Sequence, residues 1–379
     1  MLVVPIMTAA AAVVVNDVTG RKIVYDPVDL PLTSLCGDSR EEASADHGLE
    51  NIVEVRADVL LLHGMTPNGR KCWSLVDHGE RNIPQQTSKS VAKHVRKLVE
   101  AAEIEAAAMS SGDDAEAAGA RRRISALRCI LPDRPGYGDS DPACEDIGVV
   151  EEAVSRGYSY GDFARDMVRV LVHASGEAED TNSTSERLLV VLGTSSGGPG
   201  ALALRNHFLN EMDDCDELRK YYTGGVAGTI LCSSDCPYAH PDCPDEILGE
   251  DAKDSNGRTK WEYIRDESQK SFRERNRLGW ITDYTLERSD WGFNLARPGQ
   301  EGHALDGDTA RRFCSPAVHA YLGGRRDFAG SRLCGPFLAE LIGGDATLEE
   351  MLDQDHFYAS RKPAVLARMV VKAIAQHLR

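Results

Sequence analysis

The sequence predicts an α/β fold in which helices cover both faces of a mostly parallel central sheet. Short apolar runs, typical of buried strands, alternate along the chain with segments of helical periodicity. Such alternation indicates βαβ units, whose parallel strands are buried on both faces. The 379 residues are 42% hydrophobic, which supplies enough apolar surface for one large core.

Each expected element can be placed along the chain in order. Residues 11–27 are predicted to form an edge hairpin, because two apolar stretches flank a turn-forming segment. Five buried strands are expected to follow, and they begin near Val59, Ala126, Leu188, Val226 and Ala317. A helical pattern starts after Asp162, which has the residue type of an N-cap. The last helix starts at Pro363, since proline is tolerated in the first helical turn.

A long insertion separates the first two of these buried strands. Residues 66–123 far exceed a usual connection between strands. Within them, residues 88–108 have the pattern of a helix. Residues 109–123 are poor in bulky apolar side chains, which predicts a mobile loop.

A second segment, residues 236–310, also breaks the alternation. It is polar and rich in acidic residues, glycine and proline, yet it carries too many aromatic residues for a linker. This composition predicts an inserted helical cap over the ends of the sheet. The expected organisation is therefore a core in two parts, residues 1–235 and 311–379, with the cap between them.

Charge and cysteine content exclude several classes of function. The net charge of −17, from 43 basic and 60 acidic residues, opposes binding to nucleic acid or to an anionic membrane surface. Ten cysteines are scattered along the chain, and the tightest group, Cys232, Cys236 and Cys243, lacks the paired spacing of a zinc site. We therefore expect no metal, reduced thiols and a cytoplasmic protein with neither nucleic-acid nor membrane partners.

The residues Gly193-Thr194-Ser195-Ser196-Gly197 match the pattern G-x-S-x-G. In a chain with 34 glycines the match alone is weak, but here it follows an expected strand and opens an expected helix. This is the setting of a nucleophile elbow, where a sharp turn exposes a serine hydroxyl at the end of a strand. A phosphate-binding loop would need a lysine or a G-x-G-x-x-G pattern, and neither occurs in this stretch. Ser195 is therefore the candidate nucleophile.

A serine hydroxyl needs a base to take its proton, and His356 is the best placed of eleven histidines. It lies between the strand-like residues 346–352 and the last helix. In chain order it follows both the serine and either candidate acid, as the elbow arrangement requires. The rival histidines are His63, His240, His303 and His319.

Two carboxylates compete as the acid that orients this base. Asp327 follows a strand that ends in Gly-x-x-Asp, which places a carboxylate at the carboxyl edge of the sheet, where active sites of open α/β folds gather. Asp235 also follows a strand and is the alternative. The expected oxyanion donors are the backbone N–H groups of Ser196, directly after the nucleophile, and of Met65, just beyond the first buried strand.

Together these segments resemble the α/β-hydrolase superfamily, and in particular its esterase-like serine hydrolases. The matching stretches are LLLHGM (60–65), LPDRPGYGDSD (131–141), the elbow, WGFNL (291–295), LGGRRD (322–327) and DQDHF (353–357). The most specific of them is the 131–141 stretch, which fits the D-x-x-G-x-G-x-S loop of that family. The loop is mainly architectural there, so we assign neither Asp133 nor Ser140 to catalysis.

The resemblance implies an α/β-hydrolase fold with Ser195 as nucleophile, Asp327 as acid and His356 as base. It also implies a serine hydrolase that cleaves a small carboxylic ester, or a related acyl bond, through an acyl-enzyme intermediate without a cofactor. Trp280, Trp291 and Phe293 are the candidate lining of an apolar acyl pocket. Two alternatives stay open: a ligand-binding protein that kept the fold and lost or slowed the chemistry, and an acyltransferase with the same triad.

Overall fold

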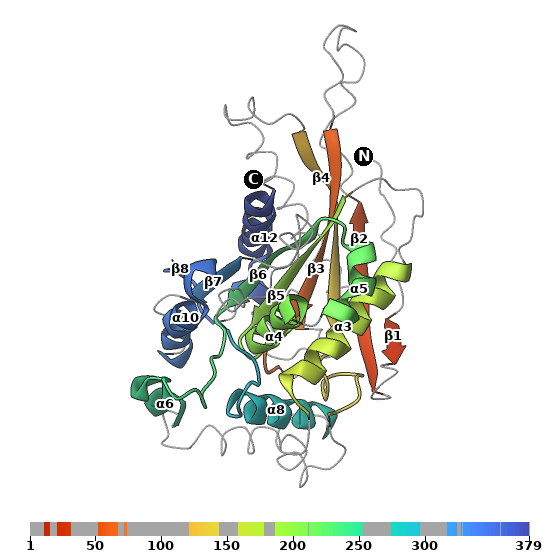
Figure 1. Cartoon of the computed structure of the whole chain (residues 1–379). Helices are drawn as coiled ribbons and strands as arrows, with labels where there is room; N and C mark the ends of the chain where they lie inside the picture. The colour runs from red at the N-terminus through yellow and green to blue at the C-terminus, as the bar shows by residue number, and fades with distance from the viewer. Residues whose placement is uncertain are drawn as a thin grey trace, which may run out of the picture.

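The computed structural model of the chain is drawn in Figure 1. It describes residues 11–15, 21–31, 52–66, 72–73, 121–143, 158–177, 186–210, 212–252, 274–295, 317–323, 327, 329–356 and 358–378. The predicted helix of residues 88–108 and the rival histidine His303 lie outside the described residues.

The predicted α/β fold is confirmed by the central sheet, which has eight strands within the described residues. In spatial order these are β1 (Ala12–Val15), β2 (Lys22–Pro31), β4 (Arg121–Pro132), β3 (Ile52–Leu62), β5 (Glu186–Thr194), β6 (Gly225–Cys232), β7 (Val318–Gly323) and β8 (Ala346–Met351). All neighbours from β4 to β8 pair in parallel, whereas β1 and β2 form antiparallel pairs. The carboxyl ends of six parallel strands therefore meet at one edge.

Two predicted segments differ from the structure at their carboxyl ends. The hairpin expected over residues 11–27 is present at the sheet edge as β1 and β2, and its second strand continues to Pro31. The mobile loop expected over 109–123 is wrong at its end, because Arg121 opens β4 and pairs with Ile52 of β3. Three consecutive arginines give no apolar signal, so only pairing with β3 identifies them as strand residues.

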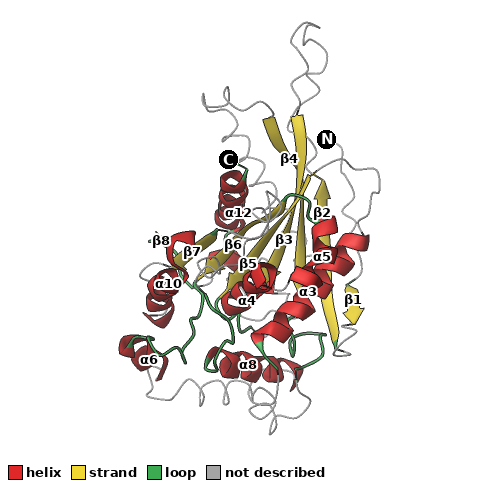
Figure 2. Cartoon of the chain, viewed as in Figure 1, coloured by secondary structure: helices red, strands yellow, loops and turns green. Residues whose placement is uncertain are grey.

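Helices cover both faces of the sheet, as Figures 1 and 2 show. One face carries α3 (Tyr160–Glu177), α4 (Gly197–Asn210), α5 (Met212–Tyr221) and α10 (Ala329–Ile342). The other face carries α11 (Tyr358–Arg361) and α12 (Pro363–His377). In β3, Leu60 and Leu62 pack into the first core while Val59 and Leu61 pack into the second. Successive side chains of a strand point to opposite faces, which is why an unbroken apolar run marks a strand buried on both sides.

Helix α3 begins three residues earlier than its sequence pattern indicates. Ser159 is the cap, because its Oγ accepts a hydrogen bond from the Asp162 N–H at 3.3 Å. The Asp162 carboxylate in turn accepts hydrogen bonds from the N–H of Ser159 at 2.9 Å and from its hydroxyl at 2.8 Å. The assignment of Asp162 as the cap is thus wrong, since it is the third helical residue of a reciprocal capping box.

Two helices of the described part of residues 236–310 lie beyond the carboxyl edge of the sheet (Figure 1). They are α6 (Asp245–Ala252), which packs against α10, and α8 (Glu274–Glu287). Helix α8 contacts the loop after β4, where the Gly279 N–H donates to Gly136 O at 3.2 Å. A cap with the bounds 236–310, and the division of the core into 1–235 and 311–379, stay predictions.

None of the helices described is both long enough and apolar enough to cross a membrane.

A buried ion pair joins β3 and β4. Arg128 Nε donates to Asp58 Oδ1 at 3.0 Å, Nη2 contacts Oδ2, and Nη1 donates to Ala174 O at 2.6 Å. The Tyr222 hydroxyl also donates to Asp58 Oδ2, at 2.8 Å. The two charged side chains are only 7% and 4% exposed. Removal of one partner of such a pair lowers the free energy of unfolding far more than removal of both.

We expect Arg128→Met to lower the free energy of unfolding by about 3–5 kcal/mol, because it leaves the Asp58 charge buried without its main partner. The double variant Arg128→Met/Asp58→Leu should recover most of this loss. Urea unfolding measures both. As a control, Arg165→Met removes the half-exposed pair with Asp162 and should cost no more than about 1 kcal/mol. A single Arg128 variant as stable as the double variant would contradict the expectation.

Candidate active site

Ser195 lies in a sharp turn between β5 and α4. Its φ of 48° is in the left-handed region, which only Ser195 and Ser233 occupy among the described non-glycine residues. The turn is closed by Gly197, where a Cβ atom would lie 2.4 Å from the backbone oxygen of Leu62. The strand, turn and helix required by the predicted elbow are therefore present.

The loop after β3 abuts this serine. A Cβ atom on Gly64 would lie 2.8 Å from Ser195 Cβ and 3.4 Å from Ser195 Oγ, so only glycine allows the loop to approach so closely. Met65 follows directly, and its side chain packs against Tyr137 and Trp280. The backbone segments that carry the two predicted oxyanion donors, Met65 and Ser196, are thus both adjacent to Ser195.

His356 forms a hydrogen-bonded pair with Asp327. His356 Nδ1 lies 2.7 Å from Asp327 Oδ1, and the carboxylate side chain is fully buried while the imidazole is 10% exposed. Asp327 follows β7 and His356 follows β8, so the ends of neighbouring parallel strands supply both groups. Of the two acids weighed from the sequence, Asp327 is the one that contacts the histidine.

Ser233, which is not among the site residues predicted from the sequence, binds the other oxygen of this carboxylate. Its hydroxyl donates to Asp327 Oδ2 at 2.5 Å. It follows β6 with a φ of 47°, and its N–H donates to Tyr321 O at 2.8 Å. The available signal was its place after an apolar strand at the same edge as the elbow, but many loop serines share that signal.

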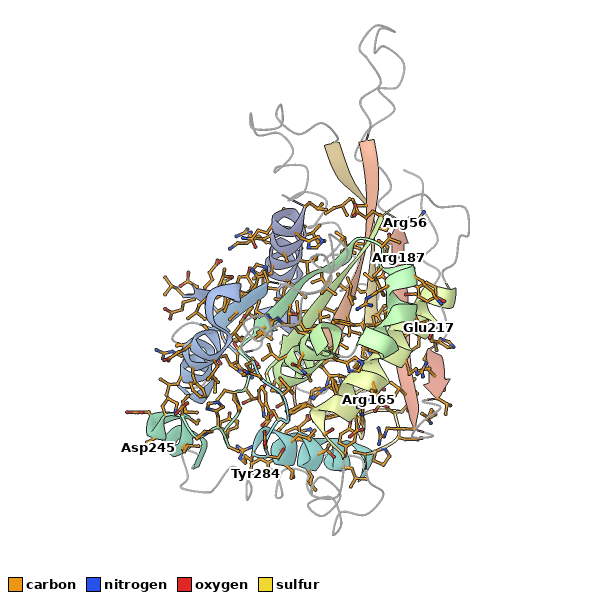
Figure 3. All side chains as sticks on the ribbon, in the orientation of Figure 1. Arg56, Arg165, Arg187, Glu217, Asp245 and Tyr284 are labelled. Atoms are coloured by element: carbon orange, nitrogen blue, oxygen red, sulfur yellow. The ribbon has the colours of Figure 1, made fainter. Side chains whose placement is uncertain are left out.

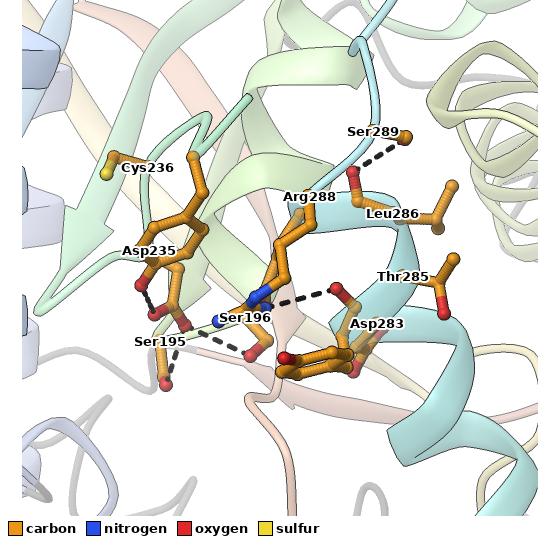
Figure 4. A network of polar contacts seen from close by, with 12 residues as sticks. Ser195, Ser196, Asp235, Cys236, Asp283, Thr285, Leu286, Arg288 and Ser289 are labelled. Carbon is orange, nitrogen blue, oxygen red and sulfur yellow. Dashed lines mark hydrogen bonds and ion pairs between the residues drawn. The ribbon is translucent and has the colours of Figure 1, made fainter. Parts of the chain in front are cut away.

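Asp235 contacts the serines of the elbow, as Figure 4 shows. Its Oδ2 accepts hydrogen bonds from the hydroxyls of Ser195 at 3.2 Å and Ser196 at 3.0 Å, and its Oδ1 accepts one from Tyr238 at 2.8 Å. Among the described residues, the hydroxyl proton of Ser195 thus has Asp235 as its acceptor and makes no hydrogen bond with His356. A rotation about χ1 of Ser195 is the motion that would exchange these two acceptors.

The three rival histidines within the described residues have contacts typical of structural residues. His319 Nδ1 lies 3.0 Å from Thr347 Oγ1, and burial, with a smaller contribution from Lys372, lowers the pKa of His319. His240 Nδ1 accepts from the Asp242 N–H at 3.2 Å. His63 is fully buried and its Nδ1 lies 2.8 Å from Gly64 O.

The three aromatic residues predicted to line a pocket lie in two different places. Trp291 is 5% exposed, packs edge-on against Tyr160 and tilts against Phe293, and its indole N–H donates to Glu287 O at 3.4 Å. Trp280 instead packs in the small cluster that includes Met65 and Tyr137. Contact with Met65, in the loop that abuts Ser195, therefore favours Trp280, and the pocket role of all three stays a prediction.

Two of the three closely spaced cysteines, Cys232 and Cys236, have different surroundings. Cys232 Sγ lies 3.9 Å from Met369 Sδ, whereas Cys236 Sγ lies 3.1 Å from Cys334 Sγ. Burial raises the pKa of the Cys232 thiol to about 12, which keeps it protonated. Within the described part of the chain, no group of three or more histidine, cysteine or acidic residues has a metal-binding arrangement.

The loop of residues 133–141 is tied to β2 by its own polar groups. Ser140 Oγ donates to Asp133 O at 2.7 Å and accepts from the Val24 N–H at 2.8 Å, and Asp133 Oδ2 accepts from the Asp139 N–H at 3.0 Å. Asp133 and Ser140 therefore make the architectural contacts expected of them.

The chain matches the family model of the alpha/beta hydrolase family over residues 59–369. No curated protein matches it. Similar solved structures include an esterase from Thermogutta terrifontis (13% identity, 97% of this chain and 99% of that chain covered, TM-score 0.46). Others are an esterase from Exiguobacterium antarcticum (16%, 95% and 98%, 0.44) and a bromoperoxidase from Bacillus anthracis (15%, 97% and 99%, 0.44). Because the family model spans most of its length, the chain belongs to the alpha/beta hydrolase family.

Proposed function

We propose that this protein is a serine hydrolase that cleaves a small carboxylic ester, or a related acyl bond, through an acyl-enzyme intermediate. The observation that carries the proposal is the 2.7 Å contact between His356 Nδ1 and Asp327 Oδ1 at the sheet edge where the strained turn presents Ser195. Folding alone requires no such set of hydroxyl, imidazole and carboxylate, whereas acyl transfer uses all three.

The roles follow from the positions of the hydrogen bonds. Because Asp327 contacts Nδ1, the neutral imidazole of His356 carries its proton on Nδ1. Its Nε2 is then unprotonated and can accept the Ser195 proton. Ser195 Oγ then attacks the acyl carbon while its proton passes to His356, and Asp327 stabilises the imidazolium that forms. The two oxygens of Asp327 are held by His356 and Ser233, which fixes the orientation of the imidazole.

The developing oxyanion would be bound by the N–H groups of Ser196 and Met65. Collapse of the tetrahedral intermediate expels the leaving alcohol, which takes the proton from His356. Water then attacks the acyl-enzyme with His356 again as base, and the acid is released. For this cycle to start, the Ser195 hydroxyl has to leave Asp235 and turn to His356.

An acyltransferase would use the same residues, with an alcohol or a thiol in place of water in the second step. Incubation of the enzyme with an ester and a trial alcohol, followed by product analysis, separates the two reactions. The non-catalytic alternative is tested by labelling of the nucleophile.

We expect a fluorophosphonate probe to form one covalent adduct, at Ser195, because such probes react with serines activated by a neighbouring base. Peptide mass spectrometry locates the adduct. Ser195→Ala should abolish it, while Ser196→Ala keeps the backbone N–H of residue 196 and should still carry it. A folded wild-type protein that stays unlabelled would reject the proposal and favour a ligand-binding protein.

We expect Asp327→Asn to lower kcat for a short-chain ester by about 10⁴-fold, because loss of this carboxylate leaves the imidazole in the wrong tautomer. Asp235→Asn should change kcat by no more than about tenfold, the equivalent of one hydrogen bond. Asp353→Asn, in the exposed turn before His356, is the control for loss of a nearby charge. If Asp235→Asn is instead the more damaging of the two, Asp235 is the acid.

A further inference from the structure

The loop after β4 contains Arg134, which contacts the backbone of the elbow. Its guanidinium Nη1 donates to Ser196 O at 3.1 Å, so it binds the residue whose N–H is the proposed first oxyanion donor. The side chain is only 3% exposed. Arg134 therefore restrains the backbone of Ser196.

The backbone of Arg134 is connected to the second proposed donor through His63. The Arg134 N–H donates to His63 Nε2 at 3.3 Å, and His63 Nδ1 lies 2.8 Å from Gly64 O. Because a carbonyl oxygen only accepts, Nδ1 carries the proton and Nε2 is the acceptor. The imidazole thus links Arg134 to the Gly64–Met65 loop that abuts Ser195.

Asp283 of α8 determines where the guanidinium lies. Its two oxygens accept hydrogen bonds from Arg134 Nη1 at 2.8 Å and Nη2 at 2.7 Å, and Oδ2 also accepts one from the Tyr137 hydroxyl at 2.5 Å. Although burial opposes the charged form, the Asp283 carboxylate and Tyr137 raise the pKa of Arg134, so the guanidinium stays charged. A bidentate pair of this kind fixes orientation as well as distance.

Helix α8 is held against the same loop by two glycines. The Gly279 N–H donates to Gly136 O at 3.2 Å, and a Cβ atom on Gly279 would lie 2.5 Å from the Tyr137 ring. The position of α8, and therefore of Asp283, is defined relative to the loop that contains Arg134.

We propose that the Arg134–Asp283 pair positions the oxyanion hole, so that the geometry of both donors depends on the docking of α8. The inference rests on the proposed function, since it assigns a role to residues that contact the proposed donors. Arg134 and Asp283 act as positioning residues, because they hold the backbone of Ser196 and the Gly64–Met65 loop rather than the substrate.

The chain contains a matched control for this pair. Arg128 and Asp58 form a second buried pair of the same chemistry, with a tyrosine hydroxyl on the carboxylate and a backbone carbonyl on the guanidinium. Asp58 pairs with Leu189, six residues before Ser195, which corresponds to about 20 Å along the strand. Figure 3 shows Arg56 of β3, two residues before Asp58, and its pairing partner Arg187 of β5 on the part of the sheet away from Tyr284 of α8.

The test compares Arg134→Met/Asp283→Leu with Arg128→Met/Asp58→Leu. Each double variant removes both charges, so neither leaves a buried charge without a partner. Urea unfolding, kcat and KM for a short-chain ester, and the rate of fluorophosphonate labelling are measured for both. We expect the Arg134/Asp283 variant to lose about 10²-fold in kcat, with KM close to that of the wild type, since a misplaced donor weakens transition-state binding. The Arg128/Asp58 variant should keep its kcat.

Two single variants keep the test decisive if the double variant does not fold. Asp283→Asn preserves shape and removes charge, and it should lower kcat with little change in KM. Arg134→Lys keeps the charge but loses the bidentate contact with Asp283, and its kcat should therefore fall below that of the wild type.

The outcomes separate this inference from the proposed function. If wild-type Ser195 is not labelled, both are rejected. If the wild type is labelled and a folded Arg134/Asp283 or Asp283→Asn variant keeps its kcat, the inference alone is rejected. An equal loss of kcat in the two double variants would also reject it, because the effect would then follow from stability rather than from position.

Discussion

The candidate active site of this protein depends on one strained turn, at Ser195. A non-glycine residue in the left-handed region costs on the order of 1–3 kcal/mol, so the surrounding structure has to hold it. The Ser195 N–H donates to Cys232 O at 3.0 Å, and Ser195 O accepts from the Gly198 N–H at 2.8 Å. Gly64 and Gly197 allow the neighbouring backbone to close around the turn. The space that exposes the hydroxyl is thus created by residues that have no side chain.

Parallel strands then bring the remaining polar groups to the same edge. Residues after β6, β7 and β8 supply Ser233, Asp327 and His356, and hydrogen bonds of 2.5 and 2.7 Å connect them. Ser233 repeats the left-handed conformation of Ser195 one strand away. The strained turn at Ser195 therefore carries the proposed nucleophile, and the strained turn after the adjacent strand carries Ser233, which binds the proposed acid.

The carboxylate of Asp235 adds a second acceptor beside the nucleophile. A serine has one hydroxyl proton, so its hydrogen bond to Asp235 and a hydrogen bond to His356 exclude each other. Arg134 and Asp283 connect the backbone of Ser196 to helix α8. The hydroxyl of Ser195 is thus linked to the loop after β6, and the backbone of Ser196 is linked to helix α8.

The sequence by itself determined the α/β fold, most of the strands and helices, and the elbow, because these depend on periodicity and on residues adjacent in the chain. It also singled out Asp327 and His356 by their places after strands, and it left Asp235 open. The sequence favoured Asp327 over Asp235, but only the tertiary structure showed the contact of Asp327 with His356, since that contact depends on which strand ends lie side by side. Ser233 and the Arg134–Asp283 pair had no usable signal, because their contacts join residues 94 and 149 positions apart. Such contacts arise from strand order and helix docking, and local composition does not encode either.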